Sequence, residues 1–218
     1  MLGSNPMRRA ALALVLLVAL AQVLATGAWL AADEGIQFTD AAYHHSQVVE
    51  LRTALLQGGD RPEDRQRYGE LWYGVAVAAS FVAGTEPGAI LGLLAALLWP
   101  LLLLGAFRLG EELSPGERAL EGGVLAAILA GFVPGLFNYS RVLVLDLPLT
   151  VAVLWAQVGL LGAIRARNEG RSPRRALALA GAATLLGLGI KVQALAFLAG
   201  PLWVVAKPVL RALPPRRR

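Results

Sequence analysis

Long apolar runs separated by short charged segments constrain this chain more than any other feature of its sequence. The first run, residues 10–32, is 23 residues long, and a helix needs about 20 apolar residues to cross a bilayer. Of the 218 residues, 56% are hydrophobic and 16% are charged, whereas about 25% are charged in an average soluble domain. The sequence therefore predicts an all-α membrane protein with several transmembrane helices.

About six spans are expected. Four of them are residues 10–32, 89–107, 119–137 and 147–164. The apolar stretch 176–206 is interrupted by Lys191, and its length fits two short helices that meet at this lysine. The apolar segment 71–83 is short for a span, and its Trp72 and Tyr73 suit a membrane interface. We expect an interfacial or re-entrant helix there.

The basic residues mark one side of the membrane. Fourteen of the 20 Lys and Arg lie in the segments 8–9, 108–118, 165–175 and 207–218. Such enrichment is typical of cytoplasmic loops. We therefore expect a multi-pass protein of the inner (plasma) membrane with both termini, including the basic tail 207–218, in the cytoplasm. A further span at 71–83 would move the arginine-rich segment 165–175 outside, which disfavours it.

Composition also excludes some partners and sites. The basic excess follows the topology, so nucleic acid is not an expected partner. The chain has no cysteine, which excludes disulfides and thiolate metal sites.

In this topology, residues 33–88 form the first periplasmic loop. Its first part is rich in acidic and aromatic groups, with Asp33, Glu34, Asp40, Tyr43, His44 and His45. A solvated loop would explain this composition, and so would a site acting on a molecule held at the interface. The segment 40–57 predicts an amphipathic helix along the membrane surface, because Val48, Leu51 and Leu55 recur at helical spacing.

Three further charges lie beside or within apolar segments on the outer side: Arg141, Asp146 and Lys191. A charge at the centre of a spanning helix costs about 2.5–3.5 kcal/mol, so such residues usually have a function. The alternatives are an interfacial Arg141, a helix-capping Asp146 and a snorkelling Lys191. Together with the loop acids, these residues suit one task. The cations would bind a lipid-borne phosphate, and a carboxylate would take a proton from an acceptor hydroxyl.

These residues resemble the N-terminal transmembrane half of the GT-C glycosyltransferases of the protein O-mannosyltransferase and aminoarabinose transferase type (family 39-like). The resemblance covers most of the chain. Four features carry it: the acidic loop after the first span, the surface helix ending at Gly58-Gly59, the motif Ser140-Arg141-x4-Asp146, and Lys191 after the Gly-rich stretch 187–190. The chain departs from the family in having Tyr68-Gly69-Glu70 for a Pro-rich motif and Ile190-Lys191-Val192 for Thr-Lys-Gly.

The resemblance implies a single membrane module, residues 1–218. It would transfer a sugar from a polyprenyl-phosphate carrier to a lipid, glycan or protein acceptor at the outer face. Asp40 or Asp33 would be the catalytic base: Asp40 keeps the family's spacing to an aromatic residue, and Asp33 keeps its acid pair. We prefer Asp40. The substrate-binding residues would be Glu34, His44, Arg141, Asp146 and Lys191, with Lys191 on the carrier phosphate.

No resident cofactor or metal is expected, because the donor is the lipid-linked sugar. Asp40, His44 and His45 offer ligands for zinc, but adjacent residues on a helix point about 100° apart, so the two imidazoles should not share an ion. Membrane lipid and the polyprenyl-phosphate sugar are the expected partners. Because family members are longer, three alternatives are open: the chain is a fragment with a missing C-terminal half, a degenerate copy, or a half that needs a partner subunit.

Two other functions remain open. The chain could be a non-catalytic GT-C-like membrane protein that binds a lipid carrier or a partner subunit. A small transporter is the other alternative, but it would need polar groups near the bilayer midplane, and those found here cluster near one surface.

Overall fold

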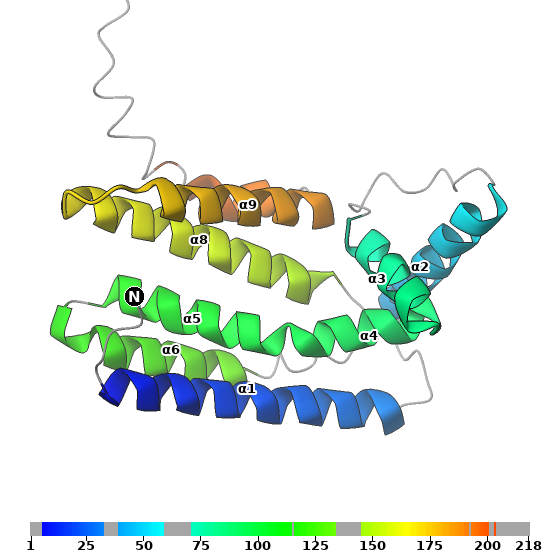
Figure 1. The fold of residues 1–218 in the computed structure, drawn as a ribbon, viewed down its shortest axis with the longest axis horizontal. Helices are drawn as coiled ribbons and strands as arrows, with labels where there is room; N and C mark the ends of the chain where they lie inside the picture. The colour runs from blue at the N-terminus through cyan, green and yellow to red at the C-terminus, as the bar shows by residue number, and fades with distance from the viewer. Residues whose placement is uncertain are drawn as a thin grey trace, which may run out of the picture.

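The computed structural model describes residues 6–32, 39–58, 71–114, 116–133, 145–191, 193–200 and 203, with side chains from residue 42 onward in the second range. Within these residues all regular structure is helical, which confirms the predicted all-α class (Figure 1). The elements are α1 (Pro6–Ala32), α2 (Thr39–Gln57), α3 (Leu71–Ala83), α4 (Pro87–Leu97), α5 (Trp99–Leu113), the 3-10 turn η2 (Gly116–Arg118), α6 (Ala119–Phe132), α8 (Asp146–Asn168) and α9 (Arg174–Ile190).

Most helices lie side by side along one axis, and α2 and α3 cross one end of this bundle (Figure 1). Helix α5 packs against α1, α6 and α8, and α8 packs against α9. At one end of the bundle, α1 and α9 begin and α8 ends. We call it the arginine end, because it carries the nine arginines 8, 9, 108, 118, 165, 167, 171, 174 and 175. The opposite end, with α2 and α3, is the α2–α3 end.

Three described helices are long and apolar enough to cross a membrane. They are Pro6–Ala32, Pro87–Leu113 (α4 with α5) and Asp146–Asn168, with 27, 27 and 23 residues. Each contains one of the predicted runs, which supports a membrane protein. Helices α6 and α9 are shorter in the described part, at 14 and 17 residues, so the number of six spans stays a prediction.

The boundary between α4 and α5 has a local cause. Pro100 has no amide hydrogen for the carbonyl of Ala96, four residues earlier. The Leu98 amide instead bonds the Ala95 carbonyl at 3.2 Å, and the α-helical pattern resumes when the Leu102 amide bonds the Leu98 carbonyl at 2.9 Å. Leu98 keeps right-handed helical dihedrals, so the apolar segment continues across the break.

Helices α2 and α3 occupy the residues that the sequence predicts, and their position at the membrane surface stays a prediction. Helix α3 has the predicted bounds, and α2 begins one residue earlier than predicted. On α2, Val48 and Leu51 are buried, whereas Leu55 is 55% exposed. The packed face of α2 instead extends toward its start, to His44, which is 1% exposed.

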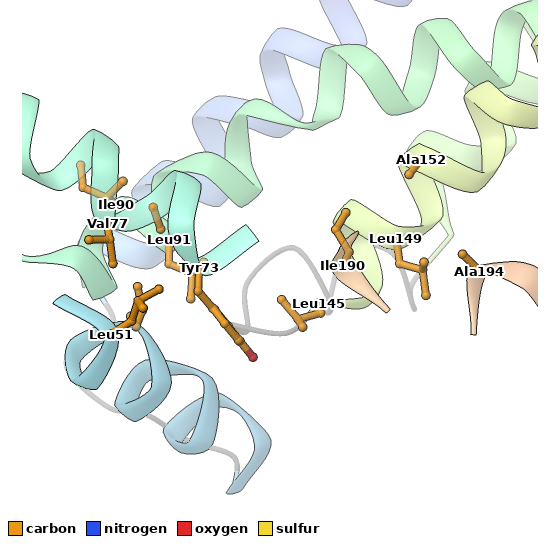
Figure 2. Close-up of a cluster of buried hydrophobic side chains, with 12 residues drawn as sticks. Leu51, Tyr73, Val77, Ile90, Leu91, Leu145, Leu149, Ala152, Ile190 and Ala194 are labelled. Atoms are coloured by element: carbon orange, nitrogen blue, oxygen red, sulfur yellow. The ribbon is translucent and has the colours of Figure 1, made fainter. Parts of the chain in front are cut away.

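One packed cluster joins α2, α3 and α4 to the start of α8 and the end of α9. Its buried members are Val48, Leu51, Tyr73, Ala76, Val77, Ile90, Leu91, Leu145, Leu149, Ala152, Ile190 and Ala194. Figure 2 shows Tyr73 between the α2–α4 members of the cluster and Leu145. Leu145 directly precedes Asp146, and Ile190 directly precedes Lys191. The cluster therefore connects α2 with the neighbours of both charged residues.

Helices α8 and α9 approach each other closely through small residues. A Cβ atom added at Gly159 would lie 2.6 Å from the amide nitrogen of Ala180 and 2.8 Å from the carbonyl oxygen of Ala176. Ala156 and Ala183 are also buried, in the cluster that includes Leu198. Small residues let two backbones come into contact, as in the packed helices of membrane proteins. The α8–α9 hairpin is therefore a closely packed unit.

Candidate functional site

Asp146 and Lys191 form an ion pair at the α2–α3 end. The Lys191 ammonium donates a hydrogen bond of 2.8 Å from Nζ to the Asp146 Oδ1. The lysine side chain is 14% exposed and the aspartate side chain 43%. The ammonium thus lies mostly within the protein, and the carboxylate reaches the surface. The ion pair thus gives the mostly enclosed ammonium an anionic partner.

The lysine occupies a break between two helices. Helix α9 ends at Ile190, and Lys191 has extended dihedrals, with φ −151° and ψ 133°. Its amide still bonds the Gly187 carbonyl at 2.9 Å, and its carbonyl accepts from the Ala194 amide at 3.1 Å. Helix resumes at residues 194–200. This agrees with the prediction of two helical segments that meet at Lys191.

Asp146 has a different role from the helix cap that was one alternative. The capping position of α8 is Leu145, and among the described residues no side chain caps the helix. Asp146 is the first residue of α8, where a negative charge is favoured by the helix dipole. The capping interpretation is therefore wrong. The carboxylate instead contacts Lys191, 45 positions later in the chain.

His44 joins α2 to α3. A hydrogen bond of 2.5 Å connects its ring Nδ1 with the hydroxyl of Tyr73. The two residues are only 1% and 4% exposed, and the ring of Tyr43 packs edge-on against the imidazole. His44 therefore fixes how α2 lies on α3. Its predicted contact with substrate stays a prediction.

His45 lies beside a different partner. Its Nε2 is 3.7 Å from the Oε1 of Glu86. The other oxygen of Glu86 accepts hydrogen bonds from the amides of Gly88 and Ala89, at 2.9 and 3.2 Å, and so caps α4. The two adjacent imidazoles therefore contact different elements. Among the residues with described side chains, no three His, Asp or Glu are grouped to hold a metal ion.

The sequence analysis missed Tyr73 and Glu86 as partners. Tyr73 was considered only as an interfacial aromatic residue, although a histidine on the apolar face of α2 requires a buried polar partner. The signal for Glu86 was also present, since it directly precedes Pro87 and Gly88. Proline is favoured in the first turn of a helix, and the residue before it takes the capping position.

Four predicted site residues lie wholly or partly outside the residues that the structure describes. Asp33, Glu34 and Arg141 are not among the described residues, and Asp40 is described only as backbone in the first turn of α2. Position 40 is one helical turn before His44 on the same helix. Of the predicted residues with described side chains, Asp146 and Lys191 are in contact, and His44 packs with the neighbouring cluster residue Tyr73.

The chain was compared with family models, curated proteins and solved structures, and none of the three comparisons finds a match.

Proposed function

We propose that this chain is a membrane glycosyltransferase, or the core module of one, that transfers a sugar from a polyprenyl-phosphate carrier to an acceptor at the outer face of the membrane. The observation that carries the proposal is the enclosed Lys191 ammonium, held by Asp146 at the end of two packed apolar helices. The family resemblance of the motifs around both residues supports the same function.

The proposed reaction needs two groups. An acceptor hydroxyl attacks the anomeric carbon of the sugar, its proton passes to a carboxylate, and the bond from that carbon to the carrier phosphate breaks. The departing phosphate requires positive charge, and an ammonium largely shielded from water acts on it more strongly than an exposed one. Lys191 supplies this charge in the proposal, and Asp40, or Asp33, accepts the proton.

The position of α2 supports the choice of Asp40. Residue 40 belongs to the first turn of α2. One turn later, His44 is bonded to Tyr73, and Val48 and Leu51 pack in the same cluster as Leu145 and Ile190. A base on this turn would be held on a helix that belongs to the same packed cluster as the neighbours of the ion pair. Such pre-organisation is what acid–base catalysis requires.

The charge distribution supports a proposed orientation. Among residues with described side chains, the arginine end has nine Arg and five Glu (9 − 5 = +4), namely Glu111, Glu112, Glu117, Glu121 and Glu169. The α2–α3 end has Arg52 and Lys191 against Glu50, Glu86 and Asp146 (2 − 3 = −1). By the positive-inside rule, the arginine end would face the cytoplasm of the inner membrane and the ion pair would face outward. The start of α1 would then be cytoplasmic, and we propose the same side for the C-terminus because its segment 207–218 is basic.

The test uses the purified full chain in detergent, with polyprenyl phosphate as the binding probe and a panel of labelled polyprenyl-phosphate sugars as donors. Asp40→Asn should abolish sugar transfer and leave binding of polyprenyl phosphate nearly unchanged, because it removes only the base. Lys191→Ala should weaken binding of the phosphate itself. Arg52→Ala is the matched control, because it also removes a cation from the α2–α3 end. The Cζ atom of Arg52 lies over the ring of Phe81, 5.4 Å from the ring centre.

The outcomes separate the candidate functions. Binding that depends on Lys191, without transfer from any donor, would support the non-catalytic carrier-binding protein. Binding that is equally strong in wild type and Lys191→Ala would overturn the proposed role of the ion pair. If Asp40→Asn transfers sugar at the wild-type rate and Asp33→Asn does not, the base is Asp33.

A further inference from the structure

The turn between α8 and α9 displays a group of exposed arginines. Helix α8 ends at Asn168 and α9 begins at Arg174. The turn is ordered by hydrogen bonds, including one of 2.7 Å from the Arg171 amide to the Ala166 carbonyl, and Gly170 adopts the left-handed conformation, with φ +67°. We call the four exposed arginines of this region the arginine turn: Arg167, Arg171, Arg174 and Arg175.

Most of this positive charge has no acidic partner among the described residues. Arg171 pairs with Glu169. No acid pairs with Arg167, Arg174 or Arg175 within the part of the chain that the structure describes. Nearby Arg165 differs, because its Nε is 3.0 Å from Glu112 and its Nη2 donates to the Glu111 carbonyl. Arg165 therefore joins α8 to α5, whereas the side chains of the arginine turn are exposed at the surface of the protein.

The arginine turn lies next to an apolar surface. It includes the end of α8, one of the candidate membrane spans, and the start of α9. Directly after Arg175, the side chains of Leu177 and Leu179 on α9 are 44% and 38% exposed. At a rise of about 1.5 Å per residue, these leucines lie only a few ångströms further along the helix axis. A boundary between exposed arginine and exposed leucine is typical of the level at which lipid headgroups meet acyl chains.

From this arrangement we propose that the arginine turn is a binding site for the phosphate groups of anionic phospholipids. A guanidinium presents a planar fork of donors that matches phosphate oxygens two at a time, which a lysine ammonium cannot do. All described basic residues of the arginine end are arginine. The site is at the opposite end of the molecule from Asp146 and Lys191 and does not depend on the proposed glycosyl transfer.

The test measures lipid binding to the purified full chain in a neutral detergent. Phosphatidylglycerol is titrated in, and bound lipids are counted by native mass spectrometry. Each arginine removed near an anionic headgroup is expected to weaken binding about fivefold, so Arg174→Gln/Arg175→Gln should lose about 25-fold in affinity. The control is Arg9→Gln/Arg118→Gln, which removes the same charge from exposed arginines of the same end on other elements. It should bind as wild type does.

A second variant keeps the charge and changes the geometry. Arg174→Lys/Arg175→Lys should also bind phosphatidylglycerol more weakly than wild type, because the paired hydrogen bonds are lost. Equal losses in the Arg174/Arg175 and Arg9/Arg118 glutamine variants would overturn the proposal, since they indicate diffuse attraction. If Arg174→Lys/Arg175→Lys binds phosphatidylglycerol with wild-type affinity, the proposed pairs of hydrogen bonds from guanidinium to phosphate are overturned. Displacement of the lipid by equimolar inorganic phosphate would overturn a lipid site in favour of a soluble anion.

Discussion

Arg8 and Glu111 are joined by two hydrogen bonds, each 3.0 Å long, from the Nε and Nη2 of the guanidinium to the two carboxylate oxygens. The pair connects the first turn of α1 to the end of α5, across 103 positions of sequence. Arg108 donates a further bond of 3.0 Å to the same carboxylate. Glu111 is therefore the centre of a small charged network at the arginine end.

Glu111→Gln should destabilise the protein. Its side chain is 12% exposed, and the substitution removes the charge that accepts bonds from Arg8 and Arg108. Charge-assisted hydrogen bonds contribute about 1.5–3 kcal/mol, so we expect a loss of about 2 kcal/mol. Thermal unfolding in detergent measures the loss. The exposed Glu117→Gln, near the same end, should unfold at the wild-type temperature. The same loss in both variants would show that overall charge is responsible.

Tyr73→Phe should loosen α2 without unfolding the bundle. It removes the bond to His44 and keeps the ring in the cluster, so a cost of about 1–2 kcal/mol is expected, confined to α2 and α3. Hydrogen exchange of the backbone amides measures where protection is lost. Thr53→Ala, on the exposed face of α2, is the control and should leave exchange unchanged. Uniform loss of protection over all helices would contradict the local role of this bond.

Gly159 and Gly162 provide a matched pair on α8. Alanine at Gly159 places a methyl group 2.6 Å from the Ala180 nitrogen, whereas at Gly162 the nearest atom is 3.7 Å away. Gly159→Ala should cost about 1–3 kcal/mol through overpacking, and Gly162→Ala should be neutral or slightly stabilising, because alanine is the better helix former. Thermal unfolding of both variants decides the point. Equal stabilities would mean that α8 and α9 are not in close contact.

The proposed topology is tested by reporter fusions after Arg171 and after Arg218. Both junctions follow arginine-rich segments, and both reporters should be active in the cytoplasm. A third fusion after Gly58, at the end of α2, should be active only outside. A periplasmic signal at either of the first two positions would contradict the orientation.

The local structure was predictable because it depends on neighbouring residues. Apolar runs of sufficient length located the candidate spans, helical spacing located α2, and a charge within an apolar stretch located the break at Lys191. The pairing of side chains was not predictable in this way. Asp146 meets Lys191, and Arg8 meets Glu111, only because particular helices lie side by side, and the periodicity of one helix does not say which helix is its neighbour.

The capping alternative for Asp146 was wrong for a related reason. Aspartate two residues before a proline at a helix start is a common capping pattern, and the residues around Asp146 did not indicate a direct ion pair with a lysine 45 positions later. The acids and the arginine in 33–38 and 134–144 lie outside the described residues, so their predicted roles remain predictions.

The close contact of α8 and α9 has a consequence for depth in the membrane. Helix α8 has 23 residues and is therefore about 34 Å long, slightly more than the roughly 30 Å hydrocarbon core of a bilayer. Because the two helices meet backbone to backbone at Gly159, we expect the hairpin to move as one piece. Fixing its arginine turn at one headgroup layer would then set the height of Asp146 and Lys191 at the other layer. In a thinner bilayer the whole hairpin would tilt, and the ion pair would stay near the headgroups.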